Sequence, residues 1–381
     1  MTIDERLNAE EFFLPAIRMI NSVKHATSIG LGLGELREFS VDSKITDALT
    51  ESLSNAGVNY SDNAGLPVLR ESIAVLQKKI DGFSYNKENI VITIGVQNAI
   101  YTVVKTLNKL GAKRILIPEI NFGIYKKIPK EFGVEVVNYK LTSGFNIDLE
   151  YLSSIIKSDD IVLINSPANP TGRVFTEAEQ KELSKLLQQK LTDGYVISDE
   201  IYGNLVYEGE EYKSFSVFFN RTIVVNGISK SAAAAGLRVG WIITCNKNLA
   251  KAFTANNATI LSCPPTANQY AAIPVVKGET AKTIKHYNNI LLKNRDIAIS
   301  ELQKAGIPFV KPCGSFYIFP EIGHLINDSV FDFCVSCAKQ QNGVVVIPGE
   351  IFGAENNVRI SLASMQIEEG IKRFVNFLRK S

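Results

Sequence analysis

Short apolar segments alternate with longer amphipathic stretches between positions 90 and 226, and this alternation constrains the fold more than any other feature. Six segments rich in Val and Ile end at turn-type residues and predict strands: Ile90–Ile94, Arg114–Ile117, Val134–Tyr139, Ile161–Asn165, Val196–Asp199 and Thr222–Val225. The amphipathic stretches predict helices: Gln97–Leu110, Ile124–Phe132, Leu149–Ile156 and Thr176–Gln189. Trp241–Cys245 is a candidate for one more strand. Because near-continuous apolar strands are buried on both faces, we expect an α/β fold with a mainly parallel seven-stranded sheet sandwiched by helices.

The pattern changes after position 280. A long helix is predicted over Ala281–Ala305, followed by strands at Phe309–Lys311, Phe316–Phe319, Val344–Ile347 and Val358–Ser361 and by helices at Ser329–Gln341 and Ile367–Lys380. These elements predict a smaller α+β domain. Residues 1–42 are too short for a domain of their own and are expected to pack against it. We therefore predict a large domain over 43–282 and a small domain formed by 1–42 with 283–381.

Charge and cysteine content limit the expected partners and compartment. The 381 residues include 41 Lys and Arg against 39 Asp and Glu, a net charge of +2 without a long basic run, so we expect no nucleic-acid binding. The five cysteines are too scattered for a disulfide framework. The N-terminus does not read as a signal peptide, and no run approaches the ~20 apolar residues that span a bilayer. We expect a cytoplasmic protein with no membrane partner.

Two predicted strand ends carry candidate site residues. The loop Asn165–Gly172 (NSPANPTG) follows a buried strand, at the edge where α/β proteins bind ligands. Its prolines fix the backbone and leave Asn169 free to point at a ligand; a merely rigid loop is the alternative. The next strand ends in Asp199, with Tyr202 soon after. Asp199 either caps the following helix or holds a cationic ring nitrogen, because a nearby carboxylate favours the protonated form of its partner.

Three more positions indicate how a ligand could be held. Lys230 follows a strand end and precedes small residues, so it is either a surface lysine or a sheltered one that loses its proton readily and attacks carbonyl groups. Gly95-Val96-Gln97 opens a helix, and free amides at a helix N-terminus suit phosphate, although every strand–helix unit offers such a site. Phe122 is either a core aromatic or a ring that stacks on a flat cofactor.

In their order along the chain, these motifs resemble those of the pyridoxal-phosphate-dependent class I/II aminotransferases, the fold type I enzymes of the aspartate aminotransferase superfamily. The resemblance covers Leu31 to Ser361 and rests on Leu31–Glu35 (LGLGE), Tyr60, Gly65–Arg70 (GLPVLR), Asn165–Gly172, Asp199 with Tyr202, Lys230, Arg238 and Asn357–Ser361 (NVRIS). It implies the fold type I large domain, pyridoxal 5′-phosphate (PLP) as cofactor, and a homodimer with its active site at the subunit interface.

The resemblance also implies a role for each matching residue. Lys230 would form a Schiff base with PLP and move protons, with Asp199 and Tyr202 as the other catalytic residues. Asp199 would keep the pyridine nitrogen protonated so that the ring accepts electrons, while Phe122 stacks on it. Arg359 would hold the substrate α-carboxylate with a bidentate fork, beside Asn169 and the backbone of Gly34. The implied cofactor-binding residues are Tyr60 from a second subunit, Gly95, Val96, Gln97, Phe122, Asn169, Asp199, Tyr202, Ser229, Lys230 and Arg238.

Four positions depart from the family pattern. Gly227 stands where many relatives have a serine that touches the phosphate, and Ser166 replaces the first proline of the asparagine–proline loop. Leu36-Arg37 replaces the usual proline–aspartate after Glu35. Gln97 stands where some relatives that use dicarboxylates carry a lysine, which weakens an aspartate preference.

The resemblance implies an aminotransferase that moves an amino group between an L-amino acid and a 2-oxo acid by a ping-pong mechanism. A PLP-dependent lyase or synthase acting at the β or γ carbon is the alternative, because active-site geometry decides which bond breaks. A non-catalytic PLP or amino-acid sensor would predict a degraded lysine or arginine, or an added DNA-binding domain. The CxxC pair Cys334 and Cys337 has no second pair or histidine motif, so it predicts two small apolar positions on a helix, and no metal is expected.

Overall fold

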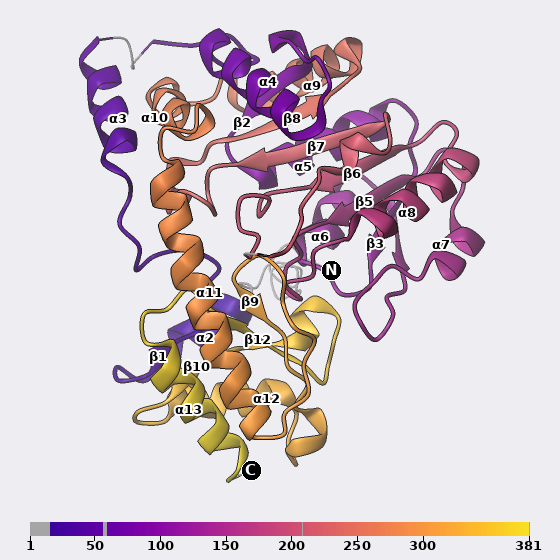
Figure 1. Cartoon of the computed structure of the whole chain (residues 1–381). Coiled ribbons are helices and arrows are strands. Elements are labelled where there is room, and N and C mark those ends of the chain that lie inside the picture. The colour runs from indigo at the N-terminus through magenta and orange to yellow at the C-terminus, as the bar shows by residue number, and fades with distance from the viewer. Residues whose placement is uncertain (1–15, 56–58, 208, 381) are drawn as a thin grey trace, which may run out of the picture.

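A sheet covered by helices on both faces forms the larger part of the molecule, and a smaller region built mainly from C-terminal residues lies beside it (Figure 1). The computed structural model describes residues 16–55, 59–207 and 209–380. The long helix α11 (Ala281–Lys304) runs from one part to the other.

The central sheet has seven strands in the order β2-β8-β7-β6-β5-β3-β4. Their bounds are β2 Ile90–Thr93, β3 Arg114–Pro118, β4 Glu135–Tyr139, β5 Ile161–Asn165, β6 Tyr195–Asp199, β7 Thr222–Gly227 and β8 Gly240–Thr244. β4, β3, β5, β6 and β7 pair in parallel, whereas β8 pairs antiparallel with both β7 and β2. Because β8 alone runs against the others, the predicted mainly parallel seven-stranded sheet is confirmed.

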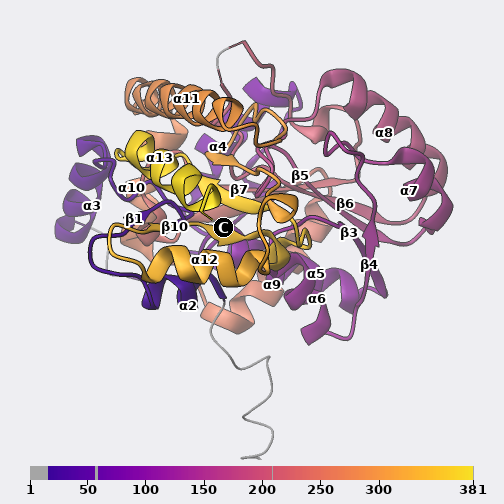
Figure 2. The ribbon, with the colours of Figure 1, turned by 90° about the horizontal axis from the view of Figure 1, so that it is seen from below.

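Alternate strand residues pack on different helices, because successive side chains point to opposite faces. One face packs on α5 (Val96–Lys109), α6 (Ile124–Glu131) and α9 (Lys247–Leu261). On the other face, β2, β7 and β8 pack on α3 (Ser43–Asn55), α4 (Pro67–Asp81) and α10 (Thr266–Val276). The remaining strands of that face pack on α7 (Leu149–Ile155) and α8 (Glu177–Lys190). Figure 2 shows α3 and α8 at opposite sides of the molecule.

The C-terminal region contains two small sheets. β1 (Ile29–Gly30) pairs parallel with β10 (Val344–Val345), and β12 (Val358–Ser361) pairs antiparallel with β9 (Tyr317–Ile318) and β11 (Ile347–Pro348). The helices of this region are α2 (Ala16–Ser22), α12 (Val330–Lys339) and α13 (Ile367–Leu378). Short 3₁₀ helices lie in the connections at Lys87–Asn89, Phe215–Val217, Ala235–Leu237, Gly323–Leu325 and Gly349–Phe352.

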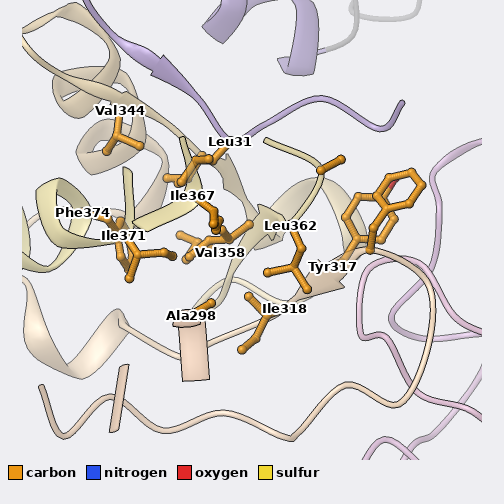
Figure 3. Packing of buried hydrophobic residues seen from close by; sticks show 14 of the residues in the cluster. Leu31, Ala298, Tyr317, Ile318, Val344, Val358, Leu362, Ile367, Ile371 and Phe374 are labelled. Atoms are coloured by element: carbon orange, nitrogen blue, oxygen red, sulfur yellow. The ribbon is translucent and has the colours of Figure 1, made fainter. Parts of the chain in front are cut away.

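One apolar core joins both ends of the chain in this region. Leu31 from the N-terminal part packs with Val358 and with Phe374 of α13, and all three are fully buried (Figure 3). This contact and the β1–β10 pairing support the proposed division into a small domain of 1–42 with 283–381 and a large one over 43–282. Residues 1–15, 56–58, 208 and 381 of these ranges lie outside the described part of the chain.

Two strand predictions for this region are wrong. Phe309–Lys311 forms no strand. Pro308 and Pro312 flank it, and proline cannot donate the backbone hydrogen bond that a ladder requires. Val344–Ile347 is not one strand either, because the chain changes partner at Val346, from β1 to β12. All four residues are buried, so their apolar pattern does not reveal the change of partner.

No helix within residues 16–55, 59–207 and 209–380 combines the length and apolar character needed to cross a membrane.

Candidate active site

A cavity of about 300 Å³ lies at the carboxyl ends of β5, β6 and β7. Asn165 ends β5 and Asp199 ends β6, and the two residues are paired in register. Residues from the N-terminal part and from the C-terminal region close the cavity. Its lining comprises Gly34, Val96, Gln97, Ile100, Phe122, Ile124, Tyr125, Asn169, Asp199, Ile201, Tyr202, Ser229, Lys230, Ala235, Arg238, Tyr317 and Arg359.

Asp199 is a buried carboxylate at the floor of this cavity, with 3% of its surface exposed. Its Oδ2 accepts a hydrogen bond from the Tyr125 hydroxyl at 2.6 Å, and its Oδ1 accepts one from the backbone amide of Ile201 at 3.1 Å. Burial raises the pKa of Asp199 to about 6, although both hydrogen bonds act to lower it. Such a group gains stability in its charged form when a cationic nitrogen lies beside it.

The predicted asparagine–proline loop is tied to the end of β6 by Asn165. The Asn165 side-chain amide donates to the carbonyl oxygens of Pro167 at 3.1 Å and Asp199 at 2.9 Å. Its Oδ1 accepts from the Asn169 backbone amide at 2.9 Å. These bonds fix the loop so that the Asn169 side chain faces the cavity, where its Oδ1 accepts a hydrogen bond from Arg359 Nη1 at 3.0 Å.

Lys230 follows β7 and reaches into the same cavity. Its Nζ donates to the backbone carbonyl of Gly34 at 2.5 Å and lies 5.9 Å from the centroid of the Tyr202 ring. Burial lowers the pKa of Lys230 to about 8, and the positive charge of Arg359 acts in the same direction. The side chain is therefore a sheltered amine and not a surface lysine, and a substantial fraction is unprotonated near pH 8.

Arg359 is a buried cation on β12, with 2% of its surface exposed. Its guanidinium lies 4.4 Å from the centroid of the Tyr317 ring and 4.8 Å from that of Phe352, which restricts its movement. Nη2 donates to the Gly32 carbonyl at 2.9 Å. Nε is buried and has no hydrogen-bond partner among the described residues, which leaves a donor for a bound carboxylate.

An anion-binding corner lies where β2 meets α5. Gly95 has φ 89°, and a Cβ at this position would lie 2.5 Å from Arg238 Nη2, so the close approach requires glycine. Arg238 itself is held by donating to the carbonyls of Ala235 at 3.0 Å and Ile94 at 3.2 Å. A guanidinium beside the first amides of a 14-residue helix suits a doubly charged phosphate.

Two departures from the family pattern have structural reasons. A Cβ at Gly227 would lie 2.7 Å from the carbonyl oxygen of Val239, so the close pairing of β7 and β8 leaves no room for the serine of many relatives. The Ser166 hydroxyl accepts a hydrogen bond from the backbone amide of Phe175 at 3.0 Å, which stabilises the loop in another way than proline.

These groups fit the pyridoxal phosphate that the resemblance implies. The corner at Gly95 and Arg238 matches the phosphate, and the buried carboxylate of Asp199 matches a protonated ring nitrogen. Lys230 supplies an amine of lowered pKa for the aldehyde, and Phe122 supplies an aromatic wall. The donor set therefore matches each charged or reactive part of the cofactor.

The structure brings nearly all of the predicted site residues together. The cavity is lined by Gly34, Val96, Gln97, Phe122, Asn169, Asp199, Tyr202, Ser229, Lys230, Arg238 and Arg359. Gly95 adjoins Arg238 at its edge. Tyr60 is different, because it lies outside the cavity with 90% of its surface exposed.

Two polar lining residues, Tyr125 and Tyr317, were not predicted from the sequence. Tyr125 holds Asp199, and its place three residues after Phe122 on a helical turn is a signal that could have identified it. The Tyr317 hydroxyl lies 3.1 Å from that of Tyr202, and its ring stacks on Arg359. Tyr317 comes from a two-residue strand of a distant region, so no local pattern connects it with the site.

The cysteine pair lies away from this cavity. Cys334 and Cys337 are buried in the apolar core on α12, as predicted for two small apolar positions of a helix. Within the described ranges no three His, Cys, Asp or Glu side chains are grouped so that they could hold a metal ion.

Comparisons with known proteins agree on one family. The family model for class I and II aminotransferases matches residues 26–378. The chain is 31% identical to the aspartate aminotransferase of Bacillus sp. (strain YM-2), over 92% of this chain and 91% of the relative. It is 33% identical to the aspartate aminotransferase of Pyrococcus abyssi, with 92% of each chain covered. The crystal structure of an aromatic aminotransferase from Pyrococcus horikoshii OT3 is similar with a TM-score of 0.86 at 28% identity, over 96% of this chain and 99% of that one.

Proposed function

Because the chain belongs to the class I and II aminotransferase family, we propose catalytic roles for its own residues that follow from their positions in the cavity. The protein is a PLP-dependent aminotransferase, which transfers an amino group between an amino acid and a 2-oxo acid. The lyase alternative is not favoured, because the matched relatives are aminotransferases. One observation carries the assignment of roles: Lys230, Asp199 and Arg359 line a single cavity.

Five side chains and the first amides of α5 are proposed to hold and tune the cofactor. When bound, PLP supplies an electron-withdrawing ring that stabilises negative charge at the substrate Cα. Asp199 holds the ring nitrogen in its protonated form, and its hydrogen bond from Tyr125 favours the ionised carboxylate. Arg238 and the first amides of α5 hold the phosphate, and Phe122 packs against the ring. Asn169 and Tyr202 are assigned to the ring's 3′ oxygen.

Lys230 is proposed as the nucleophile and the proton carrier. An unprotonated amine is required for attack on a carbonyl, and the lowered pKa of Lys230 supplies it at mildly alkaline pH. When PLP and substrate are bound, Nζ of Lys230 would accept the proton from the substrate Cα. The Gly34 carbonyl, which accepts a hydrogen bond from Nζ, orients the amine during this transfer.

Arg359 is proposed to bind the substrate α-carboxylate. Its guanidinium packs on two aromatic rings and is oriented by Asn169, so little side-chain entropy is lost when the carboxylate binds. A bidentate contact from this fixed fork also sets the orientation of the Cα–H bond relative to Lys230.

We further propose a homodimer that acts in the cytosol by a ping-pong cycle. Tyr60 is 90% exposed and lies outside its own cavity, which supports its assignment to the phosphate site of a neighbouring subunit. The five cysteines lie in the described part of the chain and are all free thiols, which suits a reducing compartment.

The assignment of Lys230 is tested with PLP and borohydride. Purified protein reduced with borohydride in the presence of PLP is expected to carry one label, which peptide mass spectrometry assigns to Lys230. Lys230→Ala is expected to remove the label and the transamination activity. The control Lys277→Ala changes an exposed lysine and is expected to retain both. Intact transamination in Lys230→Ala would contradict the assignment.

A further inference from the structure

Every charged side chain that lines the active-site cavity already has a role in the proposed function. Three cations line it, Lys230, Arg238 and Arg359, and they are assigned to the cofactor aldehyde, the phosphate and the α-carboxylate. Asp199 is assigned to the ring nitrogen. Among the described residues, no further charged side chain lines this cavity. Nothing in the lining is therefore left to neutralise a charge on the substrate side chain.

The wall near Arg359 is apolar. The Phe352 ring lies 4.8 Å from the Arg359 guanidinium and belongs to a buried cluster with Phe319 and Ile347. Phe122 packs on this cluster and also lines the cavity. Ile100, Ile124 and Ile201 also line the cavity. An amino acid anchored by Arg359 thus meets an aromatic and aliphatic wall, where burial of apolar surface is favourable.

The nearest uncommitted ion pair does not supply a cation. Glu35 follows Gly34 at the cavity, and its Oε1 accepts hydrogen bonds from Arg37 Nε at 2.9 Å and Nη2 at 2.5 Å. The Arg37 side chain is 69% exposed and does not line the cavity. The charge of Arg37 is already matched by the carboxylate of Glu35, which follows Gly34 at the cavity.

The two chain stretches around Tyr60 contain no cation. Residues 59–66 and 259–270 lie together there, since Thr266 Oγ1 donates to the Asn59 carbonyl at 2.6 Å and Asn63 donates to the Ser262 carbonyl at 2.7 Å. Neither stretch contains lysine or arginine. The neighbouring Arg70 is buried and donates to the Gly65 carbonyl at 3.0 Å and to Asp62 Oδ2 at 3.4 Å, so its charge is already matched. If a neighbouring subunit presents these two stretches to the cavity, as the proposed dimer requires, the stretches add neutral and acidic groups.

We propose that the amino donor of this enzyme carries an uncharged apolar side chain, aliphatic or aromatic, and that aspartate is a poor donor. The proposal rests on the proposed function, because it takes Arg359 as the α-carboxylate anchor. A carboxylate placed against this apolar wall would lose its water without gaining a cation, whereas an apolar side chain would be buried favourably.

Leucine and aspartate provide a matched pair for the test, because both branch at Cγ and differ mainly in charge. Half-reactions of the PLP-loaded enzyme with each amino acid are followed by the change in cofactor absorbance. We expect kcat/KM for leucine to exceed that for aspartate by at least about tenfold. Equal rates, or a faster reaction with aspartate, would overturn the proposal.

Equilibrium binding separates this proposal from the proposed function. Calorimetric titrations of the PLP-loaded enzyme use 4-methylpentanoate and succinate, which are leucine and aspartate without their amino groups and do not react. We expect 4-methylpentanoate to bind at least about tenfold more tightly. Tighter binding of succinate would overturn the proposal even if transamination occurs. Absence of transamination with every donor would overturn the proposed function, while the two affinities would still decide the side-chain preference.

Variants of Phe122 and Arg359 test whether the preference for an apolar side chain arises from contact with the apolar wall. Phe122→Ser is expected to reduce the affinity ratio of the two acids by at least about fivefold, while Phe122→Leu, which keeps the wall apolar, is expected to preserve it. Arg359→Gln is expected to abolish binding of both acids. A ratio unchanged in Phe122→Ser would show that the substrate side chain does not contact this wall. Binding of 4-methylpentanoate that persists in Arg359→Gln would show that Arg359 does not anchor the carboxylate. Either result would overturn the proposal.

Discussion

Arg359 lines the same small cavity as the reactive amine of Lys230 and affects the protonation of that amine. Burial lowers the pKa of Lys230 to about 8, and Arg359 contributes in the same direction, while Glu35 and Asp199 oppose it. Arg359 therefore has a second effect besides binding a carboxylate, because it keeps part of the Lys230 population unprotonated.

The pH dependence of PLP attachment measures this effect. Only the unprotonated amine attacks an aldehyde, so the rate of PLP attachment to the cofactor-free protein is expected to rise with pH and to level off above about 8. Arg359→Gln removes a charge that lowers the pKa of Lys230, so the inflection is expected to move to higher pH. Stopped-flow absorbance measures the rate.

The control for this shift is a distant arginine. Arg379→Gln removes an exposed positive charge near the C-terminus and is expected to leave the inflection in place. An inflection that moves equally in both variants would attribute the shift to net charge and not to Arg359.

Tyr125 is expected to set the acid limit of cofactor binding. Its hydrogen bond lowers the pKa of Asp199, which burial raises to about 6. Tyr125→Phe should therefore raise this pKa further, so that Asp199 is protonated at a higher pH and PLP affinity is lost earlier on acidification. Hydrogen bonds to charged groups contribute about 1.5–3 kcal/mol, so a shift of about one pH unit is expected.

Fluorescence titration of PLP between pH 5 and 8 measures the Tyr125→Phe shift. Tyr139→Phe is the matched control, because the buried Tyr139 hydroxyl donates to the Leu163 carbonyl at 3.0 Å and not to Asp199. The Tyr125 assignment fails if the acid limit of Tyr125→Phe coincides with that of the control.

At the scale of helices and strands, the central sheet could be predicted from the sequence because its strands are nearly continuous apolar runs. β5 has the predicted bounds, Ile161–Asn165, and the other predicted strands of the sheet differ from the observed ones by one or two residues at their ends. The strands of the C-terminal region are only two to four residues long, so periodicity cannot define them. The same contrast applies to the site. Asp199 and Lys230 could be predicted because they lie at or just after the ends of apolar strands, whereas no sequence pattern predicted Tyr317.

The start of α5 offers a test of the anion-binding corner. Gly95 and Gly111 both have positive φ, 89° and 114°, but a Cβ at Gly95 would lie 2.5 Å from Arg238 Nη2, whereas a Cβ at Gly111 would meet nothing within 4 Å. Alanine at either position strains the backbone and is expected to lower stability by about 1 kcal/mol or more. Only Gly95→Ala is expected to displace Arg238 and weaken phosphate binding, by about tenfold or more.

Thermal unfolding and calorimetric titration with PLP separate the two effects at these glycines. Gly111→Ala serves as the control for backbone strain without contact to the site. If both variants lose stability and PLP affinity in parallel, the corner between Gly95 and Arg238 has no specific part in binding phosphate.

At the scale of the whole molecule, the position of Tyr60 bears on whether one subunit or two form the active site. The residue is 90% exposed, in contrast to the cavity residues Asp199 and Arg359, which are 3% and 2% exposed. A phosphate ligand on an exposed surface is useful only if another subunit covers it. The proposed dimer would bring two copies of Tyr60 to two cavities by the same two-fold operation.

Hybrid dimers test this exchange. Lys230→Ala subunits lack the amine, and Tyr60→Ala subunits lack the ring that the neighbour requires, so each parent is expected to have little activity. In a hybrid, the cavity with an intact Lys230 receives Tyr60 from the other subunit and is complete. Random mixing makes half of the dimers hybrids with one complete site of two, so activity is expected to recover to about one quarter of wild type. Mixing Lys230→Ala with the Lys230→Ala/Tyr60→Ala double variant should recover none, and a mixture no more active than its parents would place Tyr60 outside the shared site.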